Sequence, residues 1–415
     1  MTTDTRAAVG RGTDDSPPSV RELNRSRVID ALRELGVASR ADVARHTGLS
    51  RTTISGLVAE MRDEGLVVDR PDGESPASGA GRPPTPIGLG PQAGAALGID
   101  FGKRHLAVVV ADLSHTLLAE ERREMEEGYD SADGLDAATE LVEEVLERAE
   151  IPTGQLLGVG VGLPGPVHGP SGQVGSSAIL PGWGGLHVAR EMEARLGAPV
   201  RVDNDANLGA LAELFWGAGE GAADLVYLKV ATGIGAGLVI RGRLFHGAGG
   251  TAGEIGHLTI DEHGPMCRCG NRGCLETFAA GDALVELLRS SLGHELTAEE
   301  IVDQAIGGDV ACRRAIADAG RHLGHAVGAI CNLINPSRVV VGGSIGQAGD
   351  LLLGEMREAV RRRAVLSAAQ DVEIVPGVLG ERAEVLGAVA LVLGDAEAAP
   401  VPEASERSTA GSAIR

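Results

Sequence analysis

The chain has 415 residues, of which 43% are hydrophobic and 23% are charged. This length exceeds one ordinary domain of about 100–200 residues, and this composition excludes a wholly disordered protein. No apolar run approaches the roughly 18 residues of a membrane span, and the first ten residues lack the apolar core of a signal peptide. We therefore expect a soluble, cytoplasmic protein without a membrane partner.

The formal net charge of −21 argues against nucleic-acid binding, but this charge is unevenly distributed. Residues 1–92 hold 12 arginines and 13 acidic residues, so nearly all of the negative charge lies in residues 93–415. Within residues 21–62 there are 8 arginines and 5 acidic residues, a net charge of +3. A weakly basic module joined to a strongly acidic body is consistent with two separate partners.

Four pieces follow one another along the chain. Residues 1–19 and 395–415 are polar and lack hydrophobic periodicity, which predicts disordered ends. Residues 20–91 form a compact module. In residues 95–394, apolar strand-like runs alternate with helical patterns, and this alternation predicts α/β architecture. We expect two lobes there because about 300 residues is large for a single hydrophobic core.

The module at residues 20–91 has the pattern of a winged helix-turn-helix. An apolar stripe ends at Gly36, Ser39 can cap a second helix over 40–47, and Ser50 can cap a third. The third helix has an apolar face with spacing i, i+3, i+4 and i+7, formed by Ile54, Leu57, Val58 and Met61.

The same spacing leaves Arg51, Thr52 and Ser55 exposed near the start of the third helix, with Arg40 close by. Such side chains suit entry into the major groove, where they reach phosphates and base edges. The alternative is a three-helix packing module with no nucleic-acid role.

A wing follows the third helix. Residues 66–68 and 87–89 can pair as a hairpin around a loop that contains Gly81-Arg82-Pro83-Pro84. Arg82, held extended by its neighbours, can insert into a narrow minor groove. The alternative is a flexible proline-rich linker. Helix-turn-helix and wing together predict operator DNA as a partner, and a homodimer or homotetramer, because one winged helix reads few base pairs.

The body contains a set of metal-ligating residues. His257, Cys267, Cys269 and Cys274 offer one imidazole and three thiolates within 18 residues. Four protein ligands of this kind form closed, structural Zn²⁺ sites. The alternative is a group of buried thiols without a metal.

Three glycine-rich turns follow strand-like runs, and backbone N–H groups in such turns can hold phosphates. Their candidate phosphate-contacting residues are Asp100, Gly102, Thr232, Gly233, Gly235 and Gly343. Asn204 and Asp205 follow another short strand, and open α/β sheets bind ligands at such strand ends. Asp205 could instead cap a helix that starts near Asn207.

The winged helix is followed by GLPGPV, VDNDAN and ATGIGAG, then by EIGH at 254–257 and CRCGNRGCLE at 267–276. The order of these motifs resembles that of the ROK family of repressors and sugar kinases. The resemblance covers roughly residues 22–393. It implies an actin-like ATPase fold with two lobes that close on a sugar, and a zinc ion that braces the sugar-binding loop. By this resemblance the residues that contact the sugar are Gly165, Ser177, Asn204, Asp205, Glu254, His257 and Glu276. His257 would use one ring nitrogen for zinc and the other for the sugar.

The motifs also bear on whether the protein is an enzyme. Kinase members of the family carry D-x-G-G-T in the first turn, whereas this chain has Lys103 and Arg104 after Gly102, and Ala236 stands where kinases usually carry glycine. We therefore predict a DNA-binding repressor that senses a sugar or a sugar phosphate. The alternative is a sugar kinase, in which Asp205 is the general base and ATP with Mg²⁺ is the cosubstrate.

Overall fold

The computed structural model describes residues 20–70, 85–90, 93–113, 115–168, 172–175, 180–292 and 296–395. The ends expected to be disordered, the wing loop with Arg82, and Ser177 lie outside the described residues. The chain divides into two compact units, residues 1–93 and 94–415.

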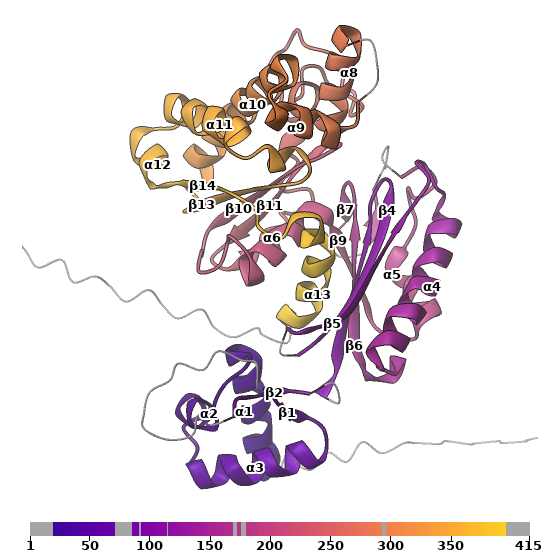
Figure 1. Ribbon diagram of the computed structural model, residues 1–415, viewed down its shortest axis with the longest axis vertical. Helices are drawn as coiled ribbons and strands as arrows, with labels where there is room; N and C mark the ends of the chain where they lie inside the picture. The colour runs from indigo at the N-terminus through magenta and orange to yellow at the C-terminus, as the bar shows by residue number, and fades with distance from the viewer. Residues whose placement is uncertain are drawn as a thin grey trace, which may run out of the picture. The chain divides into compact units, whose positions relative to one another are not determined.

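The first unit contains three helices and a two-stranded antiparallel sheet (Figure 1). Its elements are α1 (Val20–Leu35), α2 (Arg40–Thr47), α3 (Arg51–Asp63), β1 (Val67–Asp69) and β2 (Ile87–Leu89). Ser39 and Asp42 form a capping box at the start of α2, and the Ser50 side chain accepts a hydrogen bond from the Thr53 N–H at the start of α3. The predicted apolar face of α3 is buried, so hydrophobic spacing and caps together determine where these helices lie.

The second unit is built on two five-stranded mixed sheets. The first sheet has the order β5-β4-β3-β6-β9, with β3 (Ala95–Phe101), β4 (His105–Asp112), β5 (Leu117–Glu124), β6 (Leu156–Leu163) and β9 (Val200–Asn204). The second has the order β12-β11-β10-β13-β14, with β10 (Leu225–Val230), β11 (Ile234–Ile240), β12 (Arg243–Leu244), β13 (Arg338–Gly342) and β14 (Glu373–Pro376). A small hairpin, β7 (Val167–His168) and β8 (Gln173–Val174), follows β6. The described residues of the second unit therefore form two α/β lobes, as the alternation of strands and helices and the length of this region predict.

Two helices join the lobes. α6 (Asp205–Trp216) packs against β10 and β11, while α13 (Ala383–Asp395) packs against β3, β6 and α6 (Figure 1). The helices come so close that a Cβ atom at Gly387 would lie 1.9 Å from the Leu208 carbonyl oxygen. A Cβ atom at Gly160 in β6 would likewise lie 1.9 Å from the Ala388 carbonyl oxygen, which explains why glycine interrupts this apolar strand.

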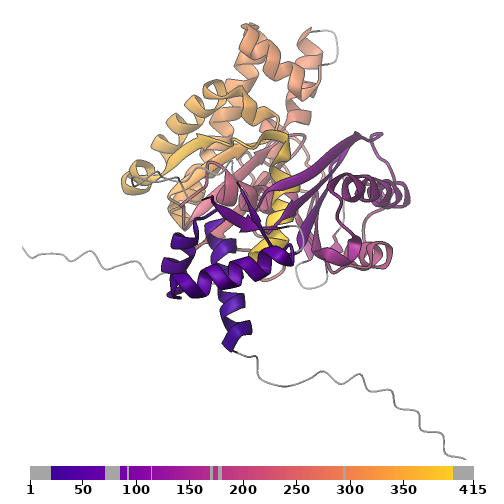
Figure 2. The ribbon, with the colours of Figure 1, turned by 60° about the horizontal axis from the view of Figure 1, so that its bottom comes forward.

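The remaining helices cover the outer faces of the sheets. α4 and α5 lie on the face of the first sheet opposite α13, as Figure 2 also shows, and the others pack with the second sheet. Their bounds are α4 (Ser131–Ala149), α5 (Val188–Leu196), α7 (Glu276–Ala279), α8 (Gly281–Leu292), α9 (Ala298–Gly307), α10 (Val310–Ile334), α11 (Asp350–Arg363) and α12 (Leu366–Asp371). Within the described ranges, we find no helix with the length and apolar character that a membrane crossing requires.

Candidate functional site

The four predicted metal ligands come together in space. His257 ends the short 3₁₀ helix Ile255–His257, and the cysteines lie in the loop that leads into α7. Their ligand atoms all lie within 4.8 Å of one another. Cys267 Sγ is 3.5 Å from His257 Nδ1, and Cys269 Sγ is 3.6 Å from Cys274 Sγ.

These separations fit a tetrahedral ion. Zn–S bonds of about 2.3 Å place two ligand atoms of a tetrahedron about 3.8 Å apart, and the shorter Zn–N bond reduces this slightly. The loop that holds the ligands is tight: Gly273 has φ +62°, and a Cβ atom there would lie 1.5 Å from the Asp261 carbonyl oxygen. Only glycine fits at this position, which accounts for the G-C pair in the motif. With all four ligand atoms within 4.8 Å of one another, the four residues can hold zinc after small side-chain shifts.

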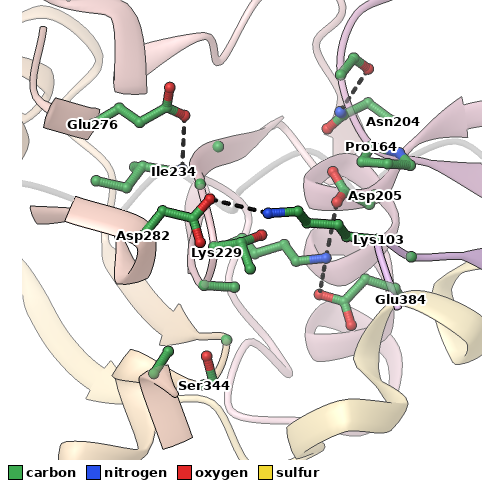
Figure 3. A pocket seen from close by; sticks show the side chains of 18 of the residues that line it. Lys103, Pro164, Asn204, Asp205, Lys229, Ile234, Glu276, Asp282, Ser344 and Glu384 are labelled. Carbon is green, nitrogen blue, oxygen red and sulfur yellow. Dashed lines mark hydrogen bonds and ion pairs between the residues drawn. The ribbon is translucent and has the colours of Figure 1, made fainter. Parts of the chain in front are cut away.

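A cavity of about 1140 Å³ in the second unit collects the predicted sugar-binding residues. Its lining includes Gly165, Asn204, Asp205, Glu254, His257 and Glu276, and also the glycine-turn residues Gly102, Thr232, Gly233, Gly235 and Gly343. These residues come from both lobes, so the pocket lies between the two sheets (Figure 3). Asp100 is buried at the end of β3, next to the pocket residue Gly102.

The pocket adjoins the group of four candidate metal ligands through His257. His257 Nδ1 faces the Cys267 thiol, and His257 Nε2 lies 3.8 Å from Glu254 Oε2. Burial raises the pKa of Glu254 above its ordinary value. One imidazole ring therefore has one nitrogen beside the cysteine thiols and the other beside the pocket residue Glu254.

Asn204 and Asp205 lie where β9 meets α6. The expectation that Asp205 caps a helix starting near Asn207 is wrong, because α6 begins at Asp205 and its N-cap is Asn204. The Asn204 side chain accepts from the Ala206 and Asn207 N–H groups and donates to the Gly165 carbonyl oxygen at 3.0 Å. Asn204 thus holds the turn Pro164-Gly165-Pro166 in place. The neighbouring Asp205 lines the pocket.

A buried lysine contacts Asp205. Lys229 Nζ lies 2.9 Å from Asp205 Oδ2 and 3.1 Å from Glu384 Oε1 (Figure 3). Burial alone would lower the pKa of Lys229, but the carboxylates of Asp205 and Glu384 raise it above its ordinary value, so the ammonium group stays charged. Since Lys229 belongs to β10 and Glu384 to α13, these ion pairs connect an element of one lobe with the helix packed on the other.

Side chains occupy two of the three glycine turns that were predicted to hold phosphate. At the first turn, the His105 ring lies against Gly102, and His105 Nε2 is 2.8 Å from Asp100 Oδ2. At the second turn, the Ile234 N–H donates to Glu276 Oε2 at 3.4 Å, and the same oxygen accepts from Arg268 Nη2 at 2.7 Å. In this state the turns therefore present side-chain groups to the pocket beside their backbone N–H groups.

The predicted DNA-contacting side chains share one surface of the first unit. Arg51, Thr52 and Ser55 are exposed on α3, and Arg40 is exposed at the start of α2. Arg40, Arg51 and Ser55 line a single shallow depression. The helix spacing therefore directs these side chains to solvent together, while Arg82 lies outside the described residues.

Two α/β lobes, each with a five-stranded sheet, and a polar pocket between them define the actin-like ATPase fold. The ROK family model matches residues 96–395, and the chain belongs to this family. A xylose repressor of Caldicellulosiruptor bescii is 31% identical over 389 residues, which cover 91% of this chain and 96% of the relative. The crystal structure of a ROK family transcriptional regulator, a homolog of the E. coli MLC protein, matches with a TM-score of 0.71 at 27% identity, over 91% of this chain and 97% of that chain.

A kinase relative matches less of the chain. A glucokinase of Thermotoga maritima is 33% identical over 313 residues, which cover 71% of this chain and 96% of the relative. The kinase thus corresponds in length to the second unit alone, whereas a match over 91% of the chain must include residues of both units.

Lys229 and Glu384 were not among the residues predicted from the sequence. Lys229 is one of only two lysines in the chain and interrupts the apolar strand LVYLKV, which is a signal for a buried charge. Glu384 carries no such signal, because it becomes a partner of Lys229 only when α13 returns to pack against β3 and β6.

Proposed function

We propose that the protein is a sugar-responsive transcriptional repressor, in which residues 20–91 bind operator DNA and residues 95–394 bind the effector sugar. The observation that carries this proposal is the similarity to a repressor over 91% of the chain, against 71% for a kinase. The exposed side chains of Arg51, Thr52 and Ser55 support DNA recognition by α3. We further propose a homodimer or homotetramer, because one winged helix reads few base pairs.

We propose that the effector contacts Asn204, Asp205, Glu254, His257 and Glu276. Carboxylates only accept hydrogen bonds, and an amide both donates and accepts, so together they suit the hydroxyl groups of a sugar. Their convergence on one cavity supports this assignment.

Zinc at the cluster of His257 with the three cysteines would hold the EIGH segment against the pocket. Because His257 and Glu254 lie in the same segment, loss of the ion should reduce sugar affinity as well as stability. The donor set of one imidazole and three thiolates supports zinc as the ion.

We also propose that the pocket does not transfer phosphate at a significant rate. A general base must take the proton of the sugar hydroxyl, but Asp205 already holds the Lys229 ammonium group on one oxygen and the Ala206 N–H on the other. Protonation of Asp205 would leave Lys229 with Glu384 as its carboxylate partner. In addition, Lys103 and Arg104 stand where kinase members carry Gly-Thr, and both pair with Glu127.

A combined binding and turnover experiment tests this function. The full-length protein is incubated with a duplex selected from a random pool, then with a panel of hexoses and pentoses, with and without ATP and Mg²⁺. We expect a sugar to change DNA affinity while no sugar phosphate is formed. ATP-dependent turnover that disappears in Asp205→Ala would instead establish the kinase alternative.

A further inference from the structure

The charges around the pocket make it unsuited to an anion. Five cationic side chains line it, namely Lys103, Arg104, Arg122, Lys229 and Arg268, against nine carboxylates. Each of these five cations is already within 4.0 Å of at least one carboxylate oxygen. A phosphate group entering the cavity would therefore have to displace a protein carboxylate or lie beside one.

The unfavourable charge is concentrated where a transferred phosphate would lie. Asp205 and Glu384 share the single ammonium group of Lys229, and Asp100 is buried nearby with its pKa below the ordinary range: burial alone would raise that pKa, but the hydrogen bond from His105 and the positive charge of Lys229 lower it. Two carboxylates thus pair with one ammonium group, and the charge of a third, Asp100, also acts on it. A phosphate ester on the sugar hydroxyl next to Asp205 would add up to two further negative charges.

The glycine turn before β11 is also unsuited to binding a phosphate group. The Ile234 N–H, which could donate to a phosphate oxygen, donates to Glu276 Oε2 instead. A Cβ atom at Gly233 would lie 2.9 Å from the same carboxylate oxygen, so Glu276 fills the space directly above the turn. Here the protein's own anion takes the place that a bound phosphate would need.

At the mouth of the pocket near α8, the cationic side chain is again paired with carboxylates. Lys103, on the turn between β3 and β4, pairs with Asp282 at 3.2 Å across the two lobes (Figure 3). Lys103 also pairs with Glu127 at 3.0 Å. A phosphate group that entered here would have to compete with these carboxylates for Lys103. It would also have to approach Glu299 and Glu300, which line the pocket at the start of α9.

We propose that the effector is an uncharged, unphosphorylated sugar, and that the pocket rejects sugar phosphates. This inference rests on the proposed function as a sugar sensor and narrows its ligand class. An uncharged sugar brings hydroxyl donors to carboxylate acceptors and requires no free cation. Like charges brought together without compensation lower affinity strongly, so we expect a phosphate ester to bind at least about 100-fold more weakly than its parent sugar.

Matched ligands test the proposal. The zinc-loaded, full-length protein is titrated calorimetrically with D-xylose, D-glucose, D-glucose 6-phosphate, N-acetyl-D-glucosamine and N-acetyl-D-glucosamine 6-phosphate. We expect at least one uncharged sugar to bind, and its phosphate ester to bind at least about 100-fold more weakly. A phosphate ester that binds as tightly as its parent overturns the inference but leaves the sensor function standing. Binding of none of these ligands contradicts the proposed function and the inference together.

Two charge-removing variants on α8 test whether the pocket carboxylates cause the preference for an uncharged sugar. Asp282→Asn removes a pocket carboxylate and releases Lys103 from one partner, so the preference for the uncharged sugar should decrease several-fold. Glu286→Gln removes the same charge one turn later on α8, from an exposed side chain outside the pocket lining, and should change the preference much less. Equal effects of the two variants would refute the role of the pocket charges.

Discussion

Replacing Lys229 with methionine tests whether its ion pairs hold the second unit together. The side chains involved are largely buried: 17% of Lys229, 16% of Asp205 and 7% of Glu384 is exposed. Removing one partner of a buried ion pair leaves uncompensated charge and typically costs about 3–5 kcal/mol. For a unit of this size, such a loss corresponds to a decrease in melting temperature of about 6–10 °C, measured by differential scanning calorimetry.

The other lysine in the chain provides a matched control. Lys103 also pairs with two carboxylates, but 47% of Glu127 and 61% of Asp282 is exposed, so Lys103→Met should cost less than about 1 kcal/mol. If both lysine variants have the same stability as the wild type, the buried ion pairs of Lys229 do not stabilise the second unit.

The stability of the wild type and that of Lys229→Met should depend differently on pH. Because the pKa of Lys229 is raised, its contribution to stability is present across pH 6–9 and is lost only as the pH rises through the folded-state pKa. In Lys229→Met, burial favours the protonated form of Glu384, so the variant should recover stability as the pH falls toward 5. Adding Glu384→Gln should restore part of the loss at neutral pH, and a double variant no more stable than Lys229→Met would refute the electrostatic explanation.

Three further predictions concern the other sites. Arg51→Ala should weaken operator binding by about 1–3 kcal/mol in a fluorescence anisotropy titration, and wild-type affinity would refute its assignment to DNA. Elemental analysis should find one zinc ion per chain in the wild type and less in Cys269→Ser; full stoichiometry in the variant would exclude Cys269 as a ligand. His246→Ala should lower stability near pH 6 but not near pH 9, because the hydrogen bond with Asp203 raises the pKa of His246 and this stabilisation is lost as the pH rises through that value. Denaturant titrations at both pH values measure it, and equal losses would contradict the prediction.

Local patterns in the sequence predict much of this molecule. The caps Ser39 and Ser50 and the apolar spacing of α3 define the helix-turn-helix, because they depend on neighbours within a few residues. That the four candidate metal ligands come together was also predictable, since they lie within 18 residues. The α/β architecture follows from the alternation of strands and helices, and the two lobes follow from a length that is large for one hydrophobic core.

Contacts between distant segments could not be predicted from such patterns. Lys229 meets Glu384 only because α13 returns to pack against the first sheet, and no periodicity specifies that partner. In the same way, Glu276 reaches the Ile234 N–H across the metal loop, so the glycine turn looked like an open phosphate site from sequence alone. Most of the predicted effector residues line one pocket, but the ion pairs that determine the charge of this pocket became visible only in the structure.

The most direct test of the account is the operator affinity of the full-length protein with and without a saturating amount of the sugar that it binds. We predict that the sugar changes this affinity by about 1–3 kcal/mol, or roughly 5- to 150-fold, because a ligand shifts an equilibrium by its differential affinity for the two states. The change should disappear in Glu254→Ala, whose affinity for DNA in the absence of sugar should remain near that of the wild type. Identical operator affinities of the wild type with and without the bound sugar would contradict the account.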